Sequence, residues 1–85
     1  MHSTAGSLDS YLAQCYRRDV LGHNINVMAP EPTPELRAAA KAGLARIDSL
    51  RLGASLANRD YVSYQNRKAL AALLARWEER DAGHV

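Results

Sequence analysis

The sequence predicts an all-α fold, a three-helix bundle, and three observations support this prediction. Apolar residues recur with helical spacing in three segments, at about residues 8–21, 34–52 and 59–81. Only Asn24–Val27 alternates like a strand, and no second segment is present to pair with it. The connection at 54–57 is short, so the second and third helices must run antiparallel. We therefore expect a long hairpin of these two helices with the first helix packed across it.

The first helix is expected at residues 8–21, after a flexible tail at residues 1–6. Ser7 can cap its start, and Gly22 can take the left-handed conformation that closes its end. Its apolar face comprises Leu8, Tyr11, Leu12, Cys15 and Tyr16. Because the chain has a single cysteine, an internal disulfide is excluded, and a buried small hydrophobe is the simplest interpretation of that residue.

The second helix is the most clearly delimited, at about residues 34–52. Thr33 can cap it, Pro34 fits its first position and Glu35 complements its dipole, while Gly53 can end it. One face gathers Leu36, Ala39, Ala40, Gly43, Leu44, Ile47 and Leu50. A glycine on an apolar stripe costs a helix about 1 kcal/mol, so we expect Gly43 to mark a close approach to the next helix.

The third helix is expected at residues 59–81, capped by Asn58, with a tail at 83–85. Its main stripe comprises Val62, Ala69, Leu70, Leu73, Leu74 and Trp77, with Asn66 in its middle. That asparagine either specifies register or bonds to the turn or to the first helix. One continuous helix is favoured, and a break before Ser63 is the alternative. The folded unit, residues 7–82, is a single domain.

An extended connection is expected at residues 23–32, because three prolines at 30, 32 and 34 exclude helix there. Its apolar residues need a place to pack, and Tyr61 and Tyr64 are candidates to cover them.

Composition limits the functional classes. The formal net charge is only +2, and acidic and basic residues are interspersed. The pI of about 9.0 therefore does not predict a strong positive electrostatic field that would attract nucleic acid. Nine of the 11 cationic residues are arginine. This bias either reflects GC-rich coding DNA or supplies side chains that form forked hydrogen bonds to carboxylates or phosphates. No apolar run near 18 residues and no signal-like N-terminus are present, so we expect a cytoplasmic protein of the kind common in bacteria and phages.

Catalytic and metal chemistry find little support. The histidines lie at positions 2, 23 and 84, without the spacing of metal ligands. Cys15 and His23 are the only Cys–His pair available, and Cys15 is expected to be buried. The five glycines are scattered, so no phosphate loop exists. We expect no enzyme, no cofactor and no metal.

Two binding functions remain. The first is a small adaptor, inhibitor or regulatory subunit that binds another protein or a second copy of itself through a second face of the third helix. The residues expected to bind are Tyr61, Tyr64, Arg67 and Lys68. The alternative is a nucleic-acid-binding regulator that mixes tyrosines with cations. The cations expected to contact nucleic acid are Arg17, Arg18, Arg59, Arg67 and Lys68.

Overall fold

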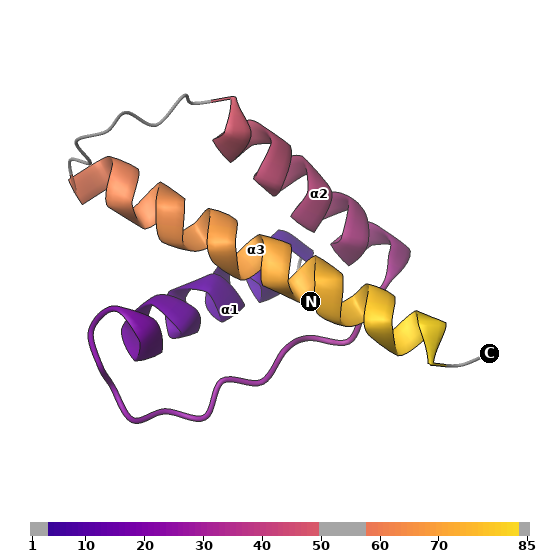
Figure 1. Cartoon of the computed structure of the whole chain (residues 1–85), viewed down its shortest axis with the longest axis horizontal. Helices are drawn as coiled ribbons and strands as arrows, with labels where there is room; N and C mark the ends of the chain where they lie inside the picture. The colour runs from indigo at the N-terminus through magenta and orange to yellow at the C-terminus, as the bar shows by residue number, and fades with distance from the viewer. Residues whose placement is uncertain (1–3, 50–57, 84–85) are drawn as a thin grey trace.

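The computed structural model describes residues 4–49 and 58–83, and in these residues it contains three helices and no strand. They are α1 (Thr4–Asp19), α2 (Pro34–Asp48) and α3 (Asn58–Ala82). Figure 1 shows α1 crossing behind α3, which lies beside α2. The all-α prediction, a three-helix bundle, is therefore confirmed.

The ends of α1 differ from the predicted range of 8–21. The helix begins at Thr4, so Ser7 lies inside it and is not its cap. No proline precedes Ser7, and Gly6 alone does not stop a helix. The helix ends at Asp19 because the chain turns at Gly22, which has a φ of 73° as its predicted role requires. In this turn the His23 amide donates a hydrogen bond of 2.9 Å to the Arg17 carbonyl.

The start of α2 is as predicted. The Leu36 amide donates a 3.0 Å hydrogen bond to Oγ1 of Thr33, and Pro34 occupies the first helical position. The helix ends at Asp48 rather than near residue 52. At this end the Ser49 hydroxyl donates a hydrogen bond of 2.6 Å to the Arg46 carbonyl. The predicted C-terminal Gly53 and the 54–57 turn lie outside the described residues.

Helix α3 runs without a break through Ser63, so the continuous helix is confirmed. Its Leu70, Leu73 and Trp77 are at most 2% exposed and form the centre of the core. The other buried members of this cluster are Leu8, Leu36, Ala40 and Ile47. Val62, predicted on the same stripe, is instead 40% exposed.

Gly43 faces α3, as predicted, but the close neighbour is a side chain. A Cβ built on Gly43 would lie 3.4 Å from Cδ1 of Leu70, which is ordinary van der Waals contact. The expectation that another backbone comes close at this residue is therefore wrong. The seam between α2 and α3 has room for one methyl group here.

The connection between α1 and α2 is extended coil, as predicted, and it packs against the C-terminal half of α3 (Figure 1). The indole Nε1–H of Trp77 donates to the Pro30 carbonyl at 3.2 Å. Arg80 forms an ion pair with Glu31, with 2.6 Å between Nη1 and Oε2. These contacts hold the proline-rich segment over the end of the core.

Among the described side chains, two ion pairs join α2 to α3, one at each end. Arg37 pairs with Asp81 at 2.8 Å, and its guanidinium lies 5.8 Å from the centroid of the Trp77 ring. Asp48 pairs with Arg67. The first residues of α2 thus lie beside the last residues of α3, and the two helices are antiparallel.

Candidate functional site

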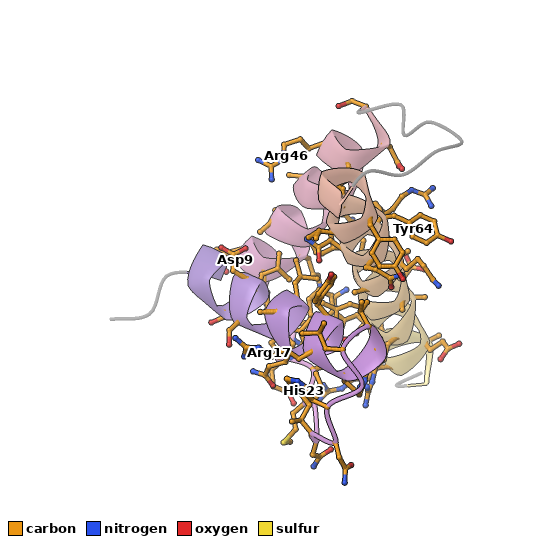
Figure 2. The ribbon with its side chains drawn as sticks, turned by 90° about the vertical axis from the view of Figure 1, so that its left-hand side faces the viewer. Asp9, Arg17, His23, Arg46 and Tyr64 are labelled. Carbon is orange, nitrogen blue, oxygen red and sulfur yellow. The ribbon has the colours of Figure 1, made fainter. Side chains whose placement is uncertain are left out.

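The side of α3 that faces away from α1 and α2 carries an exposed set of aromatic, cationic and small residues. We call this set the outer face, and its members are Tyr61, Tyr64, Lys68, Ala71, Ala72 and Ala75. At 100° per residue they lie opposite the buried Leu70, Leu73 and Trp77. In Figure 2 the Tyr64 side chain points away from the bundle.

The two tyrosines and the lysine form one cluster. The ring centroids of Tyr61 and Tyr64 are 6.5 Å apart with the planes tilted by 30°, and each tyrosine is 38% exposed. Nζ of Lys68 lies 5.5 Å from the centroid of the Tyr64 ring. Aromatic packing and cation–π attraction favour this arrangement of the three side chains, and such preorganisation reduces the entropy lost when a partner binds.

Arg67, the fourth residue predicted to bind a partner, lies at the edge of this cluster. Its Nε donates to the Asp48 carboxylate, and this hydrogen bond raises the pKa of the guanidinium. The side chain is therefore directed toward α2. It serves the α2–α3 contact first and can only flank a partner bound on the outer face.

The alternative that Tyr61 and Tyr64 cover the connection is wrong for these residues. The connection packs near Trp77, about four turns further along α3, and does not lie over the tyrosines. Of the residues that needed cover, Ile25 and Met28 are 36% and 78% exposed, and Val27 is half-buried in a hollow that Trp77 also lines. The outer face is consequently free of the segment that the sequence offered to cover it.

The cations predicted to contact nucleic acid have mixed surroundings. Arg18 pairs with Asp19 at 2.7 Å, and this hydrogen bond lowers the pKa of the aspartate. Arg67 is paired with Asp48, and Arg17 is exposed on α1. The side chain of Arg59 lies outside the described residues. Of the cations described, two thus have a carboxylate partner that reduces their attraction for phosphate.

An apolar groove between α1 and α3 was not predicted. Its cavity of about 380 Å³ has an apolar lining of Leu12, Tyr16, Leu21 and Val62, to which Asp9, Arg17 and Asn66 add polar groups. Asn66 also borders a second hollow of about 330 Å³ beside Gly43. Its side chain is half-buried, and no hydrogen bond joins it to α1 among the described residues. The predicted bond to the turn concerns residues outside the described part of the chain. Leu21, which follows the end of α1, and Val62 are 55% and 40% exposed.

Cys15 is buried, as predicted, and lies beside Tyr11. Burial and a hydrogen bond with the Cys15 side chain raise the pKa of Tyr11 to about 12. The phenol is therefore neutral near pH 7, and the pair belongs to the core.

The described residues contain no group of three or more His, Cys, Asp or Glu side chains that could hold a metal ion. Within the same part of the chain, no helix combines the length and the apolar character needed to cross a bilayer.

Comparison with known proteins finds no matching family model, no matching curated protein and no matching solved structure.

Proposed function

We propose that this protein is a small non-catalytic regulator or adaptor that works by protein–protein contact at the outer face of α3. One observation carries the proposal: Tyr61, Tyr64 and Lys68 form an exposed cluster on the side opposite the core. Tyrosine is a favoured anchor at interfaces because it offers a large rigid surface with a polar tip.

The shape of the outer face favours a helical partner. Beyond the tyrosines, Ala71, Ala72 and Ala75 leave a shallow track along the exposed side of α3. Small residues let a second helix approach closely, and the aromatic cluster at one end of the track supplies an anchor.

Nucleic-acid binding has less support. The ion pairs of Arg18 and Arg67 leave fewer free charges than the sequence indicated. Protein contact uses the same surface without requiring a strong positive field.

The test uses Tyr64→Ala, with Met28→Ala as the control. Met28 is an exposed apolar side chain outside the outer face, so the control measures the general effect of truncation. Both tagged variants and the wild type are used to capture proteins from an extract of the native host, and captured proteins are identified by mass spectrometry. We expect Tyr64→Ala to lose a specific partner, corresponding to about 2 kcal/mol of binding free energy, at nearly normal thermal stability.

Two outcomes contradict the proposal. If Tyr64→Ala unfolds well below the wild-type temperature while capture is retained, Tyr64 has a structural role. If the wild type is retained on heparin with a steep dependence on salt, and Tyr64→Ala weakens this retention, the surface binds nucleic acid.

A further inference from the structure

The exposed side of α3 carries a repeat that the core does not use. Tyr61, Gln65, Lys68, Ala72, Ala75, Glu79 and Ala82 follow one another at alternating spacings of four and three residues. This is the 3.5-residue repeat by which two helices pack along a common seam. All of these residues are exposed except Gln65, which is half-buried. We call this line of residues the seam.

The seam is complementary to itself when two copies run antiparallel. With the two-fold axis between Leu73 and Leu74, Ala72 of one copy faces Ala75 of the other, and Lys68 faces Glu79. Small residues thus meet at the crossing point, where the helices must be closest. One contact between Lys68 and Glu79 lies on each side of the crossing point. The two contacts are about 16 Å apart along the helix at 1.5 Å per residue.

The charges at these positions are available. In the described residues, the ion pairs of α3 use Arg67, Arg80 and Asp81 but neither Lys68 nor Glu79. A parallel pair would place Lys68 against Lys68 and Glu79 against Glu79, so the order of charges selects the antiparallel arrangement.

We propose that the outer face of α3 binds a second copy of this chain, as an antiparallel α3–α3 pair centred on Ala72 and Ala75. The proposal rests on the proposed function, since it names the partner of the same surface. The interface is isologous, so each contact occurs twice. Its seam is short and only partly apolar, which predicts a weak dimer that exchanges with monomer.

The test is a charge exchange followed by sedimentation velocity over a range of protein concentrations. Lys68→Glu places two like-charged contacts in each dimer, and Glu79→Lys does the same with the opposite sign. We expect each single variant to weaken dimerisation by about tenfold or more, since two attractive contacts become repulsive. The double variant, Lys68→Glu with Glu79→Lys, should restore dimerisation.

A mixture of the two single variants gives the sharpest result. In the mixed dimer both charge contacts are attractive again, so the two variants should associate with each other more strongly than either does with itself. Lys41→Glu, on an exposed lysine of α2, changes the net charge equally and should leave dimerisation unchanged. Circular dichroism confirms that each variant is folded.

Dimerisation that persists in both single variants overturns the proposed interface. A wild-type chain that stays monomeric at all concentrations overturns the dimer itself. The proposed function has a separate readout, because capture of a different protein that depends on Tyr64 would survive a monomeric result. Loss of dimerisation in the single variants without recovery in the mixture also refutes the antiparallel register.

Discussion

Replacing Trp77 with alanine is expected to remove a large part of the stability of this protein. The indole is 2% exposed and lies among Leu36, Leu70 and Leu73. Its Nε1–H holds the Pro30 carbonyl at 3.2 Å, and the ring lies beneath the Arg37 guanidinium. One side chain thus joins the core to the proline-rich connection.

The magnitude follows from these contacts. Truncation of a buried tryptophan to alanine costs about 3–5 kcal/mol, because apolar burial is lost and a cavity remains. An 85-residue domain has a free energy of unfolding of roughly 4–13 kcal/mol, so Trp77→Ala removes about a quarter of it or more. Trp77→Phe keeps most of the packing but loses the bond to Pro30, which is worth about 1 kcal/mol. The expected order of stability is wild type, Trp77→Phe, Trp77→Ala.

Urea unfolding followed by circular dichroism measures these differences, since the variants lack the only tryptophan. Met28→Ala is the matched control, because Met28 is 78% exposed and its truncation should change the free energy by less than about 0.5 kcal/mol. In the wild type, blue-shifted emission protected from iodide should accompany the folded state. Red-shifted, freely quenched emission, or a Trp77→Ala variant as stable as the control, would refute this account of the core.

Two further predictions concern Gly43 on α2 and Tyr11 on α1. Gly43→Ala should raise stability by about 1 kcal/mol through helix propensity, since its methyl group meets Leu70 at ordinary contact distance, whereas Gly43→Leu should cost about 1–3 kcal/mol by overpacking. This packing is contradicted if Gly43→Ala melts at a lower temperature than the wild type, or if Gly43→Leu melts at a higher one. Burial raises the pKa of Tyr11 from its ordinary value of 10.0 to about 12 in the folded state. Above pH 10 the unfolded chain loses this proton first, so the stabilisation that Tyr11 gives the folded state is complete below pH 10 and is lost as the pH rises toward 12. The free energy of unfolding, measured between pH 9 and 12, should depend less on pH in Tyr11→Phe than in the wild type. Tyr64→Phe is the control at an exposed site and should behave like the wild type. Equal pH dependence in all three proteins would exclude this role for Tyr11.

The sequence predicted those parts of the fold that are specified locally. The start of α2 is encoded in consecutive residues, because the hydroxyl of Thr33 and the ring of Pro34 act on their own neighbours. The position of Trp77 followed from its spacing to Leu70 and Leu73, which holds along any regular helix.

The features that were missed depend on distant parts of the chain. Val62 lies on the predicted stripe but is exposed, in a groove that it lines together with Leu12 and Tyr16 of α1. The acceptor for Trp77 is a backbone carbonyl in the connection, and any carbonyl has the same chemistry, so composition does not identify Pro30. The groove beside Asn66 is lined by residues of both α1 and α3, so neither helix predicts it alone. For the candidate site, periodicity identified the tyrosine-bearing face, whereas only the structure showed that the connection lies elsewhere.

The two ion pairs at the ends of the hairpin are arranged so that only one direction of the helices satisfies both. Along the chain the four residues read Arg37, Asp48, Arg67 and Asp81, cation and anion in turn. If α3 were reversed against α2, arginine would face arginine and aspartate would face aspartate. Exposed pairs of this kind add little to stability, yet their repulsion in the reversed arrangement discriminates against it. Exchanging Asp48 with Arg67 would abolish this discrimination, because both arginines would then lie on α2 and both aspartates on α3, whereas exchanging Arg37 with Asp48 would favour the reversed topology.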